Sequence, residues 1–72
     1  MGKETGVIKV FFRVPKTGFI TPDDGSEDLL FSHEHVPNYD EVCTKLYLGQ
    51  RVSFERGVTY PSGPGAKNVT IL

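Results

Sequence analysis

The sequence lacks the disulfides that often stabilise a very small protein and the long apolar segments that attach a protein to a membrane. Its 72 residues include one cysteine, Cys43, and no tryptophan. One cysteine cannot form an intrachain disulfide, and a lone thiol is more typical of a reducing compartment than of a secreted disulfide scaffold. No apolar run exceeds three residues, whereas a membrane span needs about 20, and residues 1–6 lack the apolar stretch of a signal peptide. We therefore expect a cytoplasmic protein with no membrane association.

The chain is long enough for one domain, residues 1–72, and no more. A domain of this size buries only about 60–65% of the surface that its unfolded chain exposes. Without a disulfide it needs a compact, closed hydrophobic core. Apolar residues make up 38% of the chain, which is ordinary for a globular protein and allows one such core.

Charge is unevenly distributed, although the net charge is only −1. Residues 1–20 carry four Lys or Arg and one Glu, and residues 42–72 carry the same numbers. Residues 21–41 carry seven Asp or Glu and no Lys or Arg. A near-neutral total therefore leaves room for a basic face and an acidic edge. The plainer interpretation is chance segregation, so charge by itself does not identify a protein that binds polyanions.

The local patterns favour strands over helices. Eight glycines and five prolines interrupt the chain every few residues and leave little room for a long helix. Alternating or β-branched stretches predict strands over residues 5–13, 18–21, 28–32, 50–56 and 66–72. A turn is expected at 22–25, a loop at 60–65 and one helical turn at 40–45, capped by Asn38 or Asp40. Five short strands at this spacing predict an all-β protein with a small closed barrel.

Four segments resemble the cold-shock domain family. Residues 6–9 followed by Phe11 resemble its first strand, and residues 18–28 resemble its G-F-I-x-x-D-D-G-x-x-D segment. Residues 48–55 resemble E-G-Q-x-V-S-F-E, and residues 63–70 resemble G-P-x-A-x-N-V-T. The segments occur in the family's order and cover nearly the whole chain. The resemblance implies a five-stranded antiparallel OB-type barrel that binds single-stranded RNA or DNA, as an RNA chaperone or a regulator of translation or transcription.

The two aromatic-rich motifs that bind nucleic acid in this family are altered here. The first usually reads K-G-F-G-F-I, and residues 15–20 read P-K-T-G-F-I. The second usually reads V-F-V-H-F, and residues 29–33 read L-L-F-S-H. At the position of the first strand where the family usually has tryptophan, this sequence has Val10. Because each base stacked on an aromatic ring contributes roughly 1–3 kcal/mol, three lost platforms would cost about 3–9 kcal/mol. We expect weakened binding or a changed base preference.

Alternation predicts which side chains face outward and which form the core. In the first strand it places Val7, Lys9 and Phe11 on one side and their neighbours on the other. The register there is open by one residue, so Val10 and Phe11 could exchange places. The expected core is Ile8 (or Phe11), Ile20, Leu29, Phe31, Val52, Phe54 and Val69. The expected outer face is Val10, Phe12, Phe19, Leu30 and Ser32.

The remaining groups on this face still suit a single strand. Phe19, Phe12 and His33 can stack on bases, and three nearby cations can hold phosphates. Tyr39 and Tyr60 lie in loops that flank this surface in the family. The plainer interpretation is that His33 and Tyr60 are ordinary surface residues and that Lys16 lies in a solvated turn. The predicted nucleic-acid-binding residues are Lys9, Val10, Phe12, Arg13, Lys16, Phe19, Leu30, Ser32, His33 and Tyr60.

Other chemistry is weakly indicated. His33 and His35 form an H-x-H pair, but a zinc site usually has a second paired element at a defined spacing. Ser32 and His33 are adjacent in sequence, so on a strand their side chains point to opposite faces, which argues against a catalytic serine–histidine pair. The acidic residues of 23–28 lack the twelve-residue spacing of a calcium loop. We therefore expect no enzyme activity, no metal and no cofactor.

A protein interface is the alternative function for the same face. Val10, Phe12, Phe19 and Leu30 would form an exposed apolar patch, which often marks a homodimer or a partner surface. Thr17 and Ser32 would be neutral in such an interface, whereas they weaken a stacking platform. The sequence leaves both hypotheses open.

Overall fold

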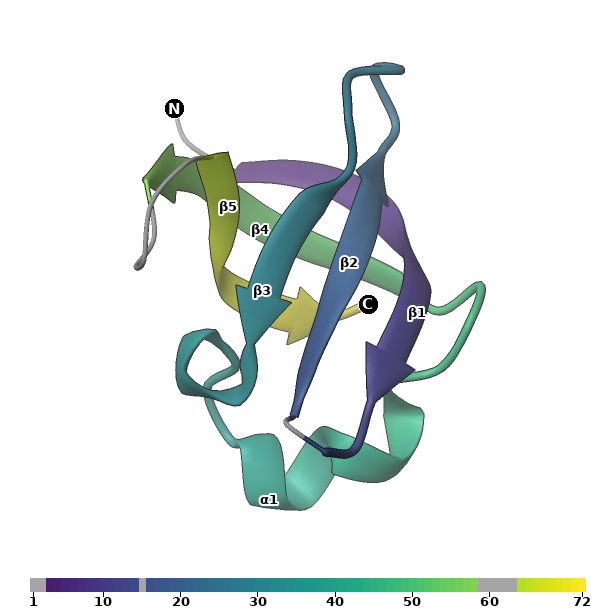
Figure 1. Ribbon diagram of the computed structural model, residues 1–72, viewed down its shortest axis with the longest axis vertical. Coiled ribbons are helices and arrows are strands. Elements are labelled where there is room, and N and C mark those ends of the chain that lie inside the picture. The colour runs from purple at the N-terminus through teal and green to yellow at the C-terminus, as the bar shows by residue number, and fades with distance from the viewer. Residues whose placement is uncertain (1–2, 15, 59–63) are drawn as a thin grey trace.

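The computed structural model describes residues 3–14, 16–58 and 64–72, with backbone only at 58 and 64. Within them lie five strands, two short 3-10 helices and one short α-helix (Figure 1). The elements are β1 (Lys3–Phe12), β2 (Thr17–Pro22), β3 (Leu29–Ser32), η1 (His33–His35), α1 (Tyr39–Val42), η2 (Cys43–Lys45), β4 (Arg51–Val58) and β5 (Pro64–Ile71). None of the described residues forms a helix long and apolar enough to cross a bilayer.

The strands form a closed barrel in the order β1-β2-β3-β5-β4. Neighbouring strands run antiparallel in every pair except β3 and β5, which meet through a parallel bridge between Leu30 and Gly65. The predicted five-stranded OB-type barrel is confirmed, with this one parallel contact as a refinement. Residues 64 and 65 belong to β5, whereas the sequence placed them in a loop; residues 59–63 of that loop lie outside the described residues.

A β-bulge in β1 changes which side chains face inward. Ile8 is opposite Ile20, and Val10 is opposite the next β2 residue, Phe19. Lys9 therefore has no partner in β2 and is the extra residue of the bulge. An extra residue reverses the alternation beyond it. Strict alternation was therefore wrong for this strand: Ile8 is buried, whereas Val10 beyond the bulge belongs to the outer side. Phe11 turns inward and packs against the core.

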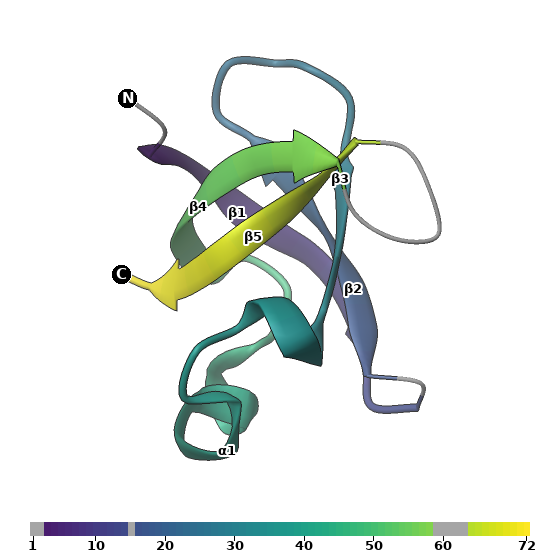
Figure 2. The same ribbon diagram turned by 90° about the vertical axis from the view of Figure 1, so that its left-hand side faces the viewer.

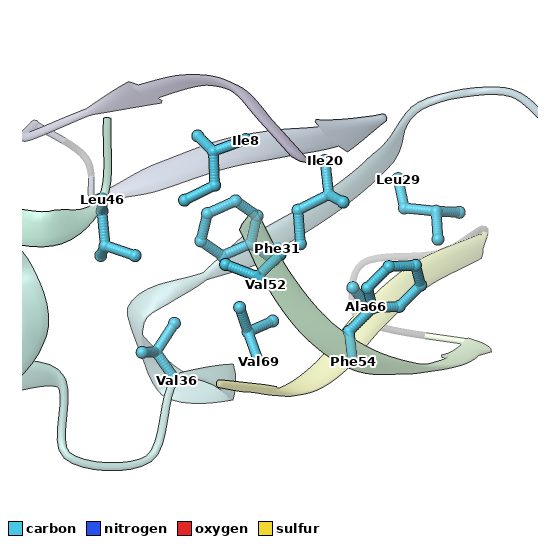
Figure 3. Close-up of a cluster of buried hydrophobic side chains, with 10 residues drawn as sticks. All are labelled: Ile8, Ile20, Leu29, Phe31, Val36, Leu46, Val52, Phe54, Ala66 and Val69. Carbon is cyan, nitrogen blue, oxygen red and sulfur yellow. The ribbon is translucent and has the colours of Figure 1, made fainter. Parts of the chain in front are cut away.

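The core fills the barrel interior (Figure 3). It contains every residue that the sequence predicted, with Ile8 in the position left open between Ile8 and Phe11. Phe31 and Phe54 are the largest of its fully buried side chains. Val36, Leu46 and Ala66 also belong to it and were not predicted. Val36 and Leu46 follow the two 3-10 helices, so the helical segment covers the core at one end of the barrel (Figure 2).

The helical segment differs from the single turn predicted at 40–45. α1 and η2 divide that stretch between them, and η1 precedes them. Asn38 adopts a left-handed conformation, with φ of 63°, and its side chain makes no capping hydrogen bond. Its carbonyl oxygen instead accepts hydrogen bonds from the amides of Glu41 (2.8 Å) and Val42 (3.1 Å). The expected turn at 22–25 is present, with Gly25 at φ of 82° and its amide donating to Pro22 O.

Candidate nucleic-acid interface

Two cross-strand rows of side chains form the outer face of β1, β2 and β3. Residues directly opposite each other in antiparallel strands share a face. One row is Val10, Phe19 and Leu30, and the other is Phe12, Thr17 and Ser32. The pairs Ile8–Ile20 and Ile20–Leu29 point to the opposite, buried side. The five residues predicted to share the outer face therefore do so.

The two aromatic rings of these rows are accessible. Phe19 is 37% exposed and Phe12 is 50% exposed. Val10 and Leu30 are half-buried on either side of Phe19. Val14, in the turn after β1, is 88% exposed. A flat surface with two rings suits stacked bases but offers fewer platforms than an all-aromatic face.

Gly18 brings β1 and β2 close together beneath this face. A Cβ at Gly18 would collide with the carbonyl oxygen of Val10 and the Cα of Phe11. The bare backbone leaves room for Phe11 on the inner side, where its ring stacks on Phe31 with centroids 5.8 Å apart. Gly18 thus allows the partly buried Phe11 to stack on the buried Phe31 while the neighbouring Phe19 ring stays exposed.

Lys9 is not an unpaired cation. Its Nζ lies 3.0 Å from Asp28 Oδ2, and Thr21 Oγ1 donates a 2.8 Å hydrogen bond to Asp28 Oδ1. The lysine side chain is still 62% exposed. A phosphate at Lys9 would therefore compete with the carboxylate of Asp28. Arg13 is exposed in the turn that follows β1.

The other predicted residues lie beside the second row. Ser32 ends β3, and its Oγ is 3.3 Å from His35 Nδ1. His33 begins η1, and its ring centroid lies 5.5 Å from that of Tyr39. His33 and His35, the H-x-H pair of the sequence, both lie in the 3-10 helix η1 and not in a strand. The described residues contain no cluster of three metal-ligating side chains. Tyr60 lies outside the described residues.

Tyr39 is a central residue that the predicted site left out. Its ring lies 6.2 Å from that of Phe11, and Lys16 Nζ lies 5.7 Å from its ring centroid. The resemblance placed Tyr39 in a flanking loop, whereas it lies in α1; its contacts could not be predicted, because they form only when α1 packs against the end of the barrel. Tyr39 joins β1, η1 and the β1–β2 turn in one cluster.

Acidic side chains of the β2–β3 loop are paired with cations from distant strands. Arg51 donates two hydrogen bonds to Asp23, of 2.8 and 2.9 Å. Arg56 contacts Glu4 at 2.6 Å and Asp24 at 3.4 Å. Lys9, Arg51 and Arg56 are thus each paired with a carboxylate, so any basic face has fewer unpaired cations than the sequence indicated.

These contacts lower the pKa values of the carboxyl groups. The hydrogen bonds from Arg51 and Thr5 lower the pKa of Asp23 below its ordinary 3.8. Hydrogen bonds from Lys9 and Thr21 do the same for Asp28. Hydrogen bonds from Arg56 lower the pKa of Glu4 below 4.5. Each of these carboxylates therefore favours the folded state when it is ionised.

We expect acid to destabilise the barrel in a defined window. Since these folded-state pKa values are depressed, the stabilisation is complete above about pH 4.5, the ordinary value of Glu4, and is lost as pH falls through the lower folded values. Melting temperature measured from pH 7 to 2 should fall progressively below that point. In 1 M salt, or in an Arg51→Gln variant, the fall should be shallower. Equal pH profiles for wild type and variant would contradict the role of this pair.

Comparisons with known proteins agree with this geometry. Residues 4–72 match the "'Cold-shock' DNA-binding domain" family. Over 72 aligned residues, 97% of this chain and 96% of the relative, the chain is 43% identical to cold shock-like protein CspG of Escherichia coli K12. It is 45% identical over 67 residues to cold shock-like protein CspA of Stigmatella aurantiaca, covering 90% and 91% of the two chains. The chain belongs to the cold-shock domain family and is a nucleic-acid-binding protein of the cold-shock type.

Proposed function

We propose that this protein binds single-stranded RNA or DNA on the outer face of β1, β2 and β3, as a cytoplasmic RNA chaperone or regulator and not as an enzyme. The observation that carries the proposal is the register of these strands. It places the exposed rings of Phe12 and Phe19 on one face. The exposed cations Arg13 and Lys16 flank that face in the β1–β2 turn.

The mechanism is passive and tolerant of sequence. Bases stack on Phe19 and Phe12, because every base has a π-face. Arg13 and Lys16 hold phosphates, and Lys9 joins them when a phosphate displaces Asp28. Val10 and Leu30 add apolar contact beside Phe19 but no π-face. Binding is therefore weaker than on an all-aromatic face, with a base preference set by fewer stacking positions.

A salt titration tests this function. Each contact with a single strand changes the slope of log K against log salt concentration by about 0.7. Two contacts, Arg13 and Lys16, predict that affinity falls about sevenfold between 50 and 200 mM salt; three, with Lys9, predict about 18-fold. Anisotropy of labelled mixed-sequence RNA and DNA of equal length gives the slope and the preferred nucleic acid. Absence of binding at 50 mM salt would contradict the proposal.

Asp28→Asn should strengthen binding. The substitution removes the ion pair with Lys9, while an amide oxygen can still accept the hydrogen bond from Thr21. One further phosphate contact would raise the slope by about 0.7 and the affinity by roughly eightfold at 50 mM salt. Glu27→Gln is the matched control, because it removes the same charge from the same loop and leaves Lys9 paired. Equal gains in both variants would show that net charge, and not Lys9, sets the affinity.

A homodimer or a protein partner is the second candidate for this face. The observation that favours it is the apolar surface formed by Val10, Phe12, Phe19 and Leu30. Sedimentation velocity over a hundredfold range of protein concentration distinguishes the two. A concentration-independent monomer that binds oligonucleotide would exclude the homodimer. A concentration-dependent mass, reversed by Phe12→Ser, would favour it.

A further inference from the structure

Lys16 has an unusual backbone conformation. Three residues other than glycine have positive φ among the described residues: Lys16 (67°), Asn38 (63°) and Asn68 (52°). Asparagine enters the left-handed region readily, because its short polar side chain can bond locally. Lysine has no such compensation, so its Cβ clashes with the following carbonyl group. Lys16 is therefore the strained residue of the three.

Contacts from two other segments hold Lys16 in place. Its carbonyl oxygen accepts a 3.0 Å hydrogen bond from the amide of His33. Its Nζ lies over the ring of Tyr39, 5.7 Å from the centroid. That ring is itself fixed by Phe11 and His33, at centroid distances of 6.2 and 5.5 Å. The β1–β2 turn, η1 and α1 thus converge on one ammonium group.

Folding alone does not account for a lysine at this position. Glycine adopts φ of 67° without strain and would offer the same carbonyl oxygen to His33. The contact of Lys16 with the half-buried Tyr39 ring contributes little to stability, because the lysine itself is exposed and stays hydrated. Strain of this kind persists where a side chain serves a function. The long cationic side chain, and not the turn, is the feature that needs an explanation.

The backbone of Lys16 adjoins the second row of the proposed interface. Lys16 directly precedes Thr17, which is opposite both Phe12 and Ser32 in the second row. Within the described residues no carboxylate lies within ion-pair distance of Lys16, whereas Lys9 and Arg51 each have one and Arg56 has two. An anionic group beside Phe12 would find this cation uncompensated. The backbone phosphate of a strand stacked on Phe12 fits this description.

We infer that Tyr39 is the positioning residue that aims the ammonium group of Lys16 at a backbone phosphate of the bound strand. The inference rests on the proposed single-strand binding and deepens it. It assigns one phosphate subsite to the β1–β2 turn and gives α1 a role in binding, because α1 supplies the ring that fixes the lysine.

Two substitutions of Lys16 test the phosphate contact. Lys16→Gln removes the charge, and Lys16→Gly also removes the strained Cβ. Both should lower affinity for a single-stranded 12-mer about eightfold at 50 mM salt and about threefold at 200 mM, with a slope smaller by about 0.7. The melting temperature of Lys16→Gly should be no lower than that of the wild type. An unchanged affinity and slope in Lys16→Gln would overturn the assignment.

A double-mutant cycle tests the role of Tyr39. Tyr39→Phe keeps the ring and should bind like the wild type, whereas Tyr39→Leu should lose affinity. If Tyr39 acts by positioning the lysine, the loss from Tyr39→Leu should largely disappear in a Lys16→Gln background. Equal losses in both backgrounds would mean that Tyr39 acts independently, and the positioning role would be wrong.

The failure of this inference is distinguishable from failure of the proposed function. If Lys16 variants bind normally while Phe19→Ala loses affinity, the face binds a single strand but its phosphate lies elsewhere. If the wild type itself does not bind at 50 mM salt, the proposed function fails and the inference fails with it.

Discussion

Replacing Phe19 with alanine is expected to lower affinity for a single-stranded oligonucleotide roughly 5- to 150-fold, the equivalent of about 1–3 kcal/mol for one stacked base. Phe19 is at the centre of the Val10–Phe19–Leu30 row and is the aromatic ring of that row, so we expect it to be a main stacking position. Because the side chain points out of the barrel, its removal leaves the core packing intact. Anisotropy titration at 50 mM salt measures the effect.

Leu72→Ala provides the control for Phe19. Leu72 is also an exposed apolar side chain, but it follows β5 on another part of the barrel. Its removal should leave affinity unchanged within error. If Phe19→Ala lowers the binding free energy by less than about 0.3 kcal/mol, or by no more than Leu72→Ala does, stacking does not occur on this face. The proposed interface would then be wrong even if the wild type binds nucleic acid.

Replacing Phe31 with alanine is expected to lower the free energy of unfolding by about 3–5 kcal/mol, the usual cost of removing a buried phenylalanine. Phe31 is only 1% exposed and stacks on Phe11. The total free energy of unfolding of a domain of this size is typically about 4–11 kcal/mol. The variant should therefore melt at least about 12 °C below the wild type. Urea denaturation followed by circular dichroism gives the free energy directly.

Leu30→Ala is the matched control for this loss. Leu30 is the preceding residue of the same strand, but it points to the outer face, where it is half-buried. Its truncation should cost only about 1 kcal/mol, because less apolar area returns to water. Similar losses for the two substitutions would contradict the inward and outward assignment of β3. That assignment also fixes Phe19 as an outer residue, since Phe19 is opposite Leu30.

Local patterns were enough to predict most of the barrel. The inward set of β2 and β3 follows from alternation, since successive side chains of a strand point to opposite faces. The turn at 22–25 follows from Pro22, Asp24 and Gly25, whose backbone preferences are local. The outward position of Phe19 and Leu30 was therefore predictable once the strands were assigned. In β1 the same rule failed, because the bulge at Lys9 arises from pairing with β2 and leaves no mark in the alternation.

The sequence by itself determined the strands, the core and the family, because these depend on patterns within a few residues and on segments that occur in order. The tertiary structure alone decided the electrostatics of the interface. It pairs Lys9 with Asp28 and Arg51 with Asp23, and it places Lys16 over Tyr39. These partners are separated by 19 or more residues along the chain. They meet only because barrel closure fixes which strands and loops become neighbours.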